Sequence, residues 1–272
     1  MKENIPVTFK WRLANLRARL RWAIGRATGF ANHRRRFKNR LGYPLNLTSP
    51  RTFNEKVQCR KIFDRNPLFP RMTDKAAARD YIDERLGPGS AERLMVPALA
   101  VVNRFEELDP ALKDQGFMLK ATHGCTDNAA VRPGSDADWA FAKERANIWI
   151  NQLQGDRLLE WSYADLPPRL IAEELFLHDN GDAPKDLKTF CFGNRCEFFT
   201  IGDLRNGVRS KSYFDRDGQR MNVRPDGKVE ADFDPPPQLH EMFDLAETLA
   251  ADFDFLRVDF LYTEAAWRLG EL

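Results

Sequence analysis

Two charged side chains interrupt the strand-like run from Phe253 to Tyr262, and they constrain the fold more than any other feature of the chain. Side chains alternate between the two faces of a β-strand, so Arg257 and Asp259 share one face. A charge in such a run destabilises the fold unless it is paired or bound to a metal ion. Two interpretations follow: an internal Arg–Asp ion pair, or a site in which Asp259 and Glu271 hold Mg²⁺ while Arg257 faces phosphate.

The length and composition of the chain limit which classes of protein it can belong to. A chain of 272 residues, 43% hydrophobic and 30% charged, is long enough for one large domain or for two lobes around a cleft. Its sequence contains no apolar run long enough to span a bilayer and no secretory leader pattern. The four cysteines form no C-x-x-C pair and the four histidines are scattered. We therefore expect a reduced, cytoplasmic protein without a zinc site.

The charge of the chain is unevenly distributed. Residues 10–40 contain no acidic residue but many basic ones: Lys10, Arg12, Arg17, Arg19, Arg21, Arg26, Arg34, Arg35, Arg36, Lys38 and Arg40. The apolar residues between them follow helical spacing: Leu13, Leu16, Leu20, Ile24 and Ala27. Three interpretations stay open: a helix on the inner face of an anionic membrane, a helix on an anionic polymer, or a helix packed on its own domain through Trp11 and the leucines. No nucleic-acid motif accompanies the charge, so nucleic acid is not expected.

The first half of the chain predicts helices. Thr52-Phe53-Asn54-Glu55 has the form of a capping box and predicts a helix to about Phe63. Thr73 predicts the start of a second helix, Asp74 to Leu86. Lys75 then falls in the first turn, where the helix dipole disfavours a cation unless an anion binds there, and Arg79 lies one turn further on. A solvated lysine countered by Asp74 is the alternative.

The rest of the chain alternates between predicted strands and helices. Runs typical of strands are Phe117–Ala121, Arg169–Phe176 and Asp186–Phe192, the last joined by Gly193-Asn194 to a hairpin partner, Arg195–Ile201. Helices are predicted around Trp139–Leu153 and Leu239–Leu249, and turns at Asp217-Gly218 and Asp226-Gly227. The pattern predicts an α+β fold in at least two lobes.

Charged residues recur where these strands should be apolar. Lys120 lies in the first strand, Glu173 and Glu174 end the second, and Asp186 and Lys188 share one face of the third. Phosphoryl transfer requires cations on phosphate oxygens, backbone N–H groups in a loop and carboxylates holding Mg²⁺. Together with Arg257 and Asp259, these make four charged features in one chain, and they suggest a nucleotide cleft.

The sequence resembles the TupA-like branch of the ATP-grasp superfamily, which is associated with teichuronopeptide and other surface-polysaccharide biosynthesis. The resemblance covers residues 45–272 and rests on segments that follow one another in order: Ser49–Lys56, Thr73-Asp74-Lys75 with Arg79, Met118-Leu119-Lys120, His123-Gly124-Cys125, Glu160–Tyr163, Pro168–Glu174, Asp186–Phe190, Arg257-Val258-Asp259 and Gly270-Glu271-Leu272.

The resemblance implies an ATP-grasp fold of two α+β lobes around a nucleotide cleft. A basic helical segment, residues 1–45, would precede an ATP-grasp domain at 46–272, with a small lobe at about 90–176 and a large lobe at about 185–272. The family pattern continues beyond Glu271, so the resemblance implies that the C-terminal end of the domain is missing.

The resemblance also implies roles for single residues. Lys120 would contact the ATP phosphates, and the His123–Asn128 loop, with His123 and Gly124, would fold over them. Lys75 is also expected to bind the cofactor. Glu173, Glu174 and the backbone at Leu175 would face adenine, and Asp186 would lie near the ribose. Arg257 would stabilise the transferring phosphoryl group, and Lys188, the second catalytic residue, would point into the same cleft. Asp259 and Glu271 would coordinate Mg²⁺.

By the same analogy, the reaction is the ATP-dependent joining of a carboxylate to an amine through an acyl phosphate. The expected partners are an acidic sugar or polysaccharide precursor of the cell envelope and an amine. Two alternatives remain. One is a glycosyltransferase, for which the four Asp-x-Asp pairs beginning at Asp136, Asp215, Asp232 and Asp252 are weak support. The other is a non-catalytic ATP-binding or scaffold protein.

Overall fold

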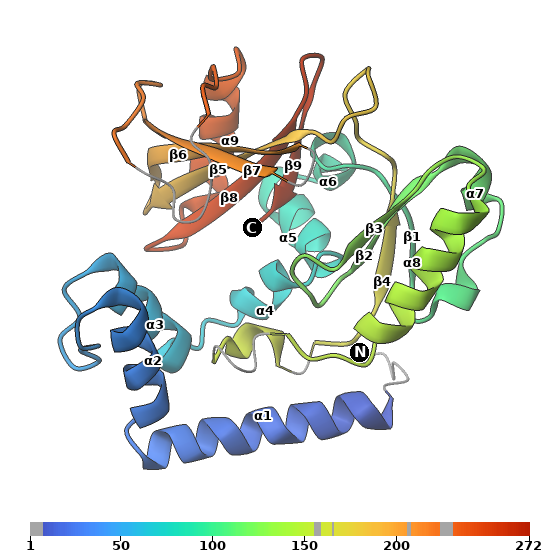
Figure 1. The fold of residues 1–272 in the computed structure, drawn as a ribbon. Helices are drawn as coiled ribbons and strands as arrows, with labels where there is room; N and C mark the ends of the chain where they lie inside the picture. Colours follow the sequence, from blue (N-terminus) through green and yellow to red (C-terminus); the bar gives the residue numbers. More distant parts are fainter. Residues whose placement is uncertain (1–7, 155–158, 165, 206–207, 224–230) are drawn as a thin grey trace. The chain divides into compact units, whose positions relative to one another are not determined.

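The computed structural model describes residues 8–154, 159–164, 166–205, 208–223 and 231–272 (Figure 1). It confirms the α+β prediction, with two antiparallel sheets. The chain divides into two compact units. The first comprises Met1–Ala77 and Leu99–Glu173, and the second comprises Ala78–Ala98 and Glu174–Leu272.

The first unit begins with four helices: α1 (Phe9–Ala27), α2 (Ala31–Leu41), α3 (Phe53–Phe63) and α4 (Leu68–Thr73). The predicted capping box is confirmed. The Thr52 hydroxyl accepts from the Glu55 N–H at 3.2 Å, and the Glu55 carboxylate accepts from the Thr52 N–H at 3.0 Å. A small core stabilises the segment around α2 and α3: Phe30, Phe37, Leu45, Leu47 and Ile62.

A four-stranded sheet follows, in the order β1-β4-β2-β3. Its strands are β1 (Ala98–Val102), β2 (Phe117–Ala121), β3 (Asn128–Val131) and β4 (Leu170–Glu173). Short helices η1 (Phe105–Glu107), α7 (Leu112–Gln115) and η3 (Trp161–Tyr163) lie in its connections. Helix α8 (Asp136–Trp149) covers one face of the sheet (Figure 1). Leu119 and Ala172 pack against it, so Lys120 and Glu173 belong to the other face.

The second unit carries a five-stranded sheet in the order β7-β6-β5-β8-β9. Its strands are β5 (Lys185–Phe192), β6 (Arg195–Arg205), β7 (Val208–Asp215), β8 (Leu256–Tyr262) and β9 (Trp267–Glu271). Helices α5 (Ala77–Leu86), α6 (Ser90–Leu94) and α9 (Leu239–Ala250) accompany them. Helix α9 buries Met242, Phe243 and Ala246, and Phe243 packs edge-on against Phe199 of β6. One face of this sheet therefore packs against α9 in the hydrophobic core, and the opposite face can carry polar side chains.

The predicted helix from Asp74 to Leu86 is wrong in its first turn. Thr73 ends α4, and its hydroxyl donates backward to the Phe69 carbonyl at 2.7 Å instead of capping the next helix. Asp74 takes over that function, because its carboxylate accepts from the N–H groups of Ala76 and Ala77 at 2.9 and 3.2 Å. Lys75 consequently precedes α5, and the helix-dipole argument for it does not apply.

The predicted turns have different outcomes. The Asp217-Gly218 turn is confirmed, because the Gly218 N–H donates to the Asp215 carbonyl at 3.1 Å. The Asp226-Gly227 turn lies outside the described residues. Within the described ranges, no helix combines the length and the apolar character needed to cross a bilayer.

Candidate active site

The second unit gathers five predicted site residues on the face of its sheet opposite α9. We call Asp186, Lys188, Arg257, Asp259 and Glu271 the charged face. Strand pairing brings them together, because Lys188 of β5 lies opposite Asp259 of β8, and Asp259 lies opposite Glu271 of β9. Directly opposed residues of antiparallel strands have their side chains on the same face, with Cβ atoms about 5 Å apart. The register thus assembles a site from segments more than seventy residues apart in sequence.

Asp259 is the hub of the charged face. Its carboxylate accepts two hydrogen bonds from the Arg257 guanidinium, at 2.6 and 2.8 Å, and one from the Lys188 ammonium at 2.9 Å. Lys188 also lies 2.8 Å from Asp186. The internal Arg–Asp pair is therefore present, but within a wider network. The Asp259 side chain is 10% exposed and that of Arg257 46%, so the carboxylate is nearly buried while part of the guanidinium stays accessible.

The carboxylates raise the pKa values of both cations. Burial lowers the pKa of the Lys188 ammonium, but Asp259 and Asp186 outweigh burial and leave the pKa raised. Burial likewise lowers the pKa of Arg257, and Asp259 again outweighs it and leaves the pKa raised. Both side chains are therefore positively charged at neutral pH, as contact with phosphate requires.

A β-bulge positions Glu271. The register shifts between Asp259 and Phe260, so that Phe260 pairs with Leu269 while Asp259 pairs with Glu271. Gly270 is the extra residue, and a Cβ there would come 3.1 Å from the Asp259 carbonyl. The bulge keeps Leu269 in the core and turns Glu271 to the charged face.

A second glycine makes room for Asp186. Gly202 of β6 lies opposite Asp186, and a Cβ on Gly202 would come 2.5 Å from Asp186 Oδ2. Only glycine therefore permits the carboxylate to lie over β6, where it reaches Lys188.

The structure adds Lys211, which the sequence analysis missed. It lies on β7 opposite Gly202, and its nitrogen lies 4.8 Å from the centre of the Tyr213 ring. Burial lowers the pKa of Lys211, as do the charges of Lys188 and Arg257, against an upward effect of Asp186 and Asp259. Alternation within Val208–Asp215 would have placed Lys211 and Tyr213 on one face, had that run been interpreted as a strand.

In the first unit, Lys120 pairs with Glu173. Its ammonium lies 2.5 Å from the Glu173 carboxylate, with side-chain exposures of 19% and 6%. The pairing is diagonal across β2 and β4, because Met118 lies directly opposite Glu173. The two predicted residues are thus brought together as an ion pair on the sheet face away from α8.

Lys75 and Gly124 are also brought together. The Lys75 ammonium donates to the Gly124 carbonyl at 2.6 Å, and its backbone N–H donates to the Thr122 carbonyl at 3.1 Å. Asp74 anchors this contact. It is 1% exposed, accepts from the Thr122 hydroxyl at 3.3 Å, and pairs with Arg169 at 3.3 Å. The segment before α5 therefore holds the loop at His123 and Gly124 in place. The sequence did not predict this function for Asp74 and Arg169.

Three predicted residues have other surroundings. His123 is buried, and its Nε2 lies 3.0 Å from the Trp149 carbonyl of α8. Burial lowers its pKa, so the ring is neutral and supports the loop from within. Glu174 is exposed and Leu175 half-buried, and the Glu174 N–H donates to the Pro97 carbonyl at 3.0 Å.

The charged face fits Mg²⁺ in part. Carboxylate oxygens are the ligands that Mg²⁺ prefers, and proteins usually supply one or two of them while phosphates and water complete the octahedron. Asp259 and Glu271 meet that requirement. No group of three or more His, Cys, Asp or Glu side chains suited to a metal occurs among the described residues, so a dedicated all-protein cage is absent from them.

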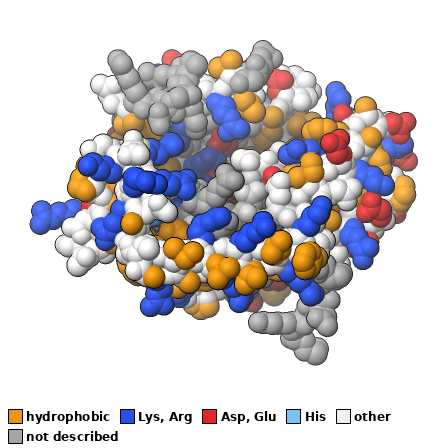
Figure 2. All heavy atoms as spheres, turned by 60° about the horizontal axis from the view of Figure 1, so that its bottom comes forward, with side chains coloured by type: hydrophobic (Ala, Val, Ile, Leu, Met, Phe, Trp, Pro, Cys, Tyr) orange, Lys and Arg blue, Asp and Glu red, His pale blue; other side chains and the backbone are white. Residues whose placement is uncertain are grey.

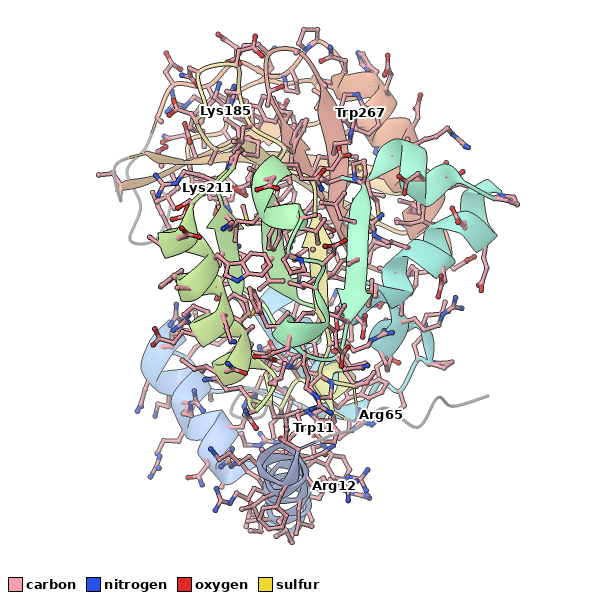
Figure 3. The ribbon with its side chains drawn as sticks, turned by 90° about the vertical axis from the view of Figure 1, so that its right-hand side faces the viewer. Trp11, Arg12, Arg65, Lys185, Lys211 and Trp267 are labelled. Atoms are coloured by element: carbon pink, nitrogen blue, oxygen red, sulfur yellow. The ribbon has the colours of Figure 1, made fainter. Side chains whose placement is uncertain are left out.

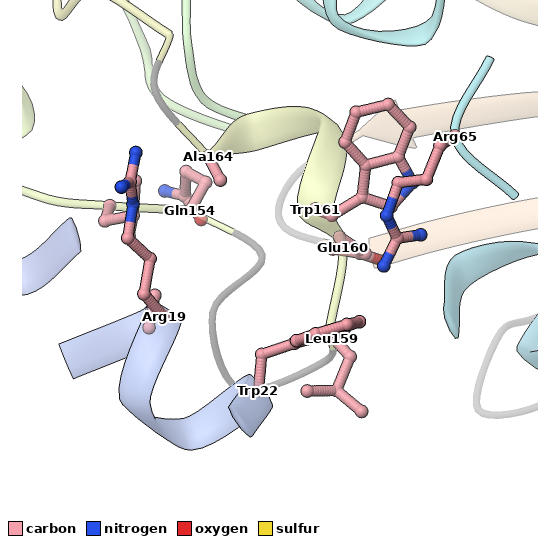
Figure 4. A pocket seen from close by; sticks show the side chains of 10 residues that line it. Arg19, Trp22, Arg65, Gln154, Leu159, Glu160, Trp161 and Ala164 are labelled. Carbon is pink, nitrogen blue, oxygen red and sulfur yellow. The ribbon is translucent and has the colours of Figure 1, made fainter. Parts of the chain in front are cut away.

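A separate pocket of about 230 Å³ lies in the first unit, between α1 and the segment around η3 (Figure 4). The Arg65 guanidinium lies between two tryptophan rings there, 5.2 Å from the centre of Trp22 and 5.0 Å from that of Trp161. Glu160 at its edge pairs with Lys61 at 3.1 Å. The lining is mainly apolar and aromatic, and it does not present the carboxylate pair that distinguishes the charged face.

The family model of the TupA-like ATP-grasp domain matches residues 55–272, and the chain belongs to that family. Among curated proteins, none matches the sequence of this chain.

Solved ATP-grasp structures resemble the chain at a distance. The ligase PsnB with its minimal precursor aligns at a TM-score of 0.41 and 10% identity, covering 75% of this chain and 52% of PsnB. The D-alanine–D-alanine ligase of Bacillus anthracis aligns at 0.41 and 14%, covering 74% and 55%. A RimK-domain ATP-grasp protein of Sphaerobacter thermophilus aligns at 0.41 and 11%, covering 79% and 60%. The chain thus spans little more than half the length of these proteins.

Proposed function

We propose that this member of the TupA-like ATP-grasp family is an ATP-dependent carboxylate–amine ligase. The observation that carries the proposal is the charged face, in which Arg257 and Lys188 converge on Asp259 while the bulge at Gly270 brings Glu271 beside it. Two cations and two carboxylates on one sheet face suit a Mg²⁺–phosphate group better than a packing surface.

The chemistry has two steps. A carboxylate oxygen of the substrate attacks the γ-phosphorus of ATP, the bond to the β-phosphate oxygen breaks, and ADP leaves. The amine nitrogen then attacks the acyl carbon, phosphate leaves with the carbon–oxygen bond electrons, and the amine loses a proton to give the amide. Bound Mg²⁺, held by Asp259 and Glu271, would supply charge neutralisation at the phosphates.

The residues of the charged face have distinct tasks in this scheme. Arg257 orients the transferred phosphoryl group through its planar, bidentate guanidinium. Lys188 neutralises negative charge that develops on the departing oxygen. Asp186 holds Lys188 in place at 2.8 Å, because a lone lysine would sample several rotamers.

The first unit would contribute phosphate contacts of its own. Lys120 and Lys75 are cations held in defined positions, by Glu173 and by the Gly124 carbonyl respectively. A phosphate group competes well for such ammonium groups. Glu173, Glu174 and the Leu175 backbone are proposed to face adenine.

An acidic sugar or polysaccharide precursor is the proposed carboxylate substrate, with an amino compound as the amine. This part of the proposal rests on the association of the TupA-like branch with surface-polysaccharide biosynthesis. A non-catalytic ATP-binding protein is the competing outcome.

The proposal is tested by screening ADP release with MgATP against paired panels of uronic acids and amino acids, with mass spectrometry of any amide. ADP release that requires both substrates, together with an amide and inorganic phosphate, would support the ligase. ATP binding without ADP release for any pair would support the non-catalytic alternative. Lys120→Ala should abolish the thermal stabilisation that ATP gives the unsubstituted chain, and Lys143→Ala, an exposed lysine on α8, should not.

A further inference from the structure

Helix α1 has two apolar faces, and among the described residues one of them packs on the protein while the other is exposed. The packed face consists of Trp11, Asn15, Ala18 and Trp22, of which Trp11 and Asn15 are buried and the other two are half-buried. Trp22 meets Phe30 edge-on, with ring centres 6.5 Å apart. Figure 3 looks along α1 and shows Trp11 on the side of the helix toward the rest of the unit and Arg12 beside the helix. The tryptophans therefore fix how the helix is rotated.

The opposite face is an exposed hydrophobic stripe. We call it the outer stripe, and its members are 36% to 78% exposed: Phe9, Leu13, Leu16, Leu20 and Ile24. Because consecutive helical residues are rotated by about 100°, this stripe lies about 180° from the packed face. It runs for about 22 Å at 1.5 Å per residue. Scattered exposed leucines are ordinary, but a continuous row marks an interaction surface.

Basic side chains border the outer stripe along its whole length. The helical rotation places three on one side and three on the other: Lys10, Arg17 and Arg21, then Arg12, Arg19 and Arg26. In the second set, the Arg26 guanidinium lies 5.1 Å from the centre of the Trp22 ring and Arg19 lines the pocket of Figure 4, so these two side chains also contact the packed side. Figure 2 shows a row of hydrophobic side chains over α1 with lysine and arginine side chains on both sides of it. Neither α1 nor α2 contains an acidic residue, so no charge on either helix offsets this field.

A row of apolar side chains bordered by basic ones fits one of three possible partners better than the other two. Nucleic acid would use the arginines but leave the leucines in water. A second copy would cover the leucines but bring two sets of six like charges together. An anionic bilayer satisfies both groups at once, because the leucines enter the acyl boundary while the arginines remain among the headgroups. α1 is too highly charged to cross a bilayer, which leaves it in the plane of the interface.

We propose that α1 docks the protein on an anionic lipid surface, with the outer stripe inserted and the flanking basic residues on the headgroups. The proposal goes beyond the ligase assignment and does not depend on it. Because the packed face stays on the protein, docking requires no rearrangement of α1.

Flotation of the full chain with vesicles tests the apolar part. Vesicles of phosphatidylglycerol and phosphatidylcholine should carry the protein, and vesicles of phosphatidylcholine alone should carry much less. Leu16→Glu with Leu20→Glu should weaken binding at least about tenfold. Phe141→Glu is the matched control, because Phe141 is 54% exposed on α8 of the same unit, as Leu16 is on α1, and its substitution should change nothing. Equal binding of the double variant would overturn the proposal.

Charge reversal tests the electrostatic part. Arg12→Glu with Arg17→Glu removes one cation from each side of the stripe and should lower binding to anionic vesicles at least about tenfold. Lys56→Glu with Arg195→Glu makes the same change in net charge at exposed sites outside α1 and should have a small effect. High salt should weaken binding in parallel, because it screens these charges. Three results would overturn the proposal: no binding to anionic vesicles, binding to single-stranded RNA that the leucine variant retains, or a dimer in solution that the leucine variant dissociates.

Discussion

The charged face and the outer stripe of α1 both break the ordinary rule of burial, in opposite ways. The charged face puts ions on strands that alternate with core positions, and its central carboxylate makes three hydrogen bonds to neighbouring cations. The outer stripe puts large apolar side chains into water, and they lie along a single helix without strand neighbours to fix them.

This difference indicates two kinds of ligand. A network with defined distances is pre-organised for a small ligand of fixed geometry, such as a metal–phosphate group. A row of flexible side chains on a rigid helix fits an extended, deformable surface. Substitutions should therefore separate the two regions, because changes to the charged face affect chemistry and changes to the stripe affect docking.

Removing the hub of the charged face should have the largest effect. Asp259→Asn deletes the negative charge that holds Arg257 and Lys188 and that would bind Mg²⁺, so MgATP-dependent ADP formation should fall at least about a hundredfold. Vesicle flotation of this variant should be unchanged. Asp217→Asn, at an exposed turn of the same unit, should retain both properties. Full turnover by Asp259→Asn would contradict the metal assignment.

Crowding the charged face should have a smaller effect. Gly202→Ala would place a Cβ 2.5 Å from the Asp186 carboxylate and push it away from Lys188. Such overpacking costs about 1–3 kcal/mol, so the KM for ATP should rise about tenfold. In the double variant Gly202→Ala with Asp186→Ala, the clash is gone. Gly202→Ala should therefore raise the KM for ATP less in the Asp186→Ala background than it does in the unsubstituted chain. Strict additivity of the two effects would argue against the close approach.

The smallest effect should come from Lys211, and it should depend on pH. Burial lowers the pKa of Lys211, so the folded state loses this proton at a lower pH than the unfolded state does. Between the two pKa values the folded state binds fewer protons, so stability should rise with pH there, up to the ordinary lysine pKa of about 10.4. ATP affinity should fall over the same interval, because the cation is lost. Lys211→Met should lower the affinity for ATP about threefold at neutral pH. It should also flatten the alkaline pH dependence of stability and that of ATP affinity. Profiles identical to those of the unsubstituted chain would remove Lys211 from the site.

Much of the charged face was predictable from local pattern. Alternation along Phe253–Tyr262 put Arg257 and Asp259 on one face, and the same rule paired Asp186 with Lys188. The start of α5 was predicted wrongly, because Thr73 and Asp74 are both good capping residues in sequence and only the hydrogen bond of Thr73 to Phe69 decides between them. Lys211 was missed because its strand is short of apolar residues.

The sequence by itself determined which side chains share a face and where charge accumulates, because these follow from the fixed periods of strand and helix. Only the tertiary structure decided which faces meet. It joined Lys188 to Asp259 through strand pairing, and it buried Trp11 while leaving Leu16 and Leu20 in water. Helix α1 has two apolar faces, and its own sequence does not show which of them becomes buried. Burial depends on a complementary surface, and that surface comes from segments far away in the chain.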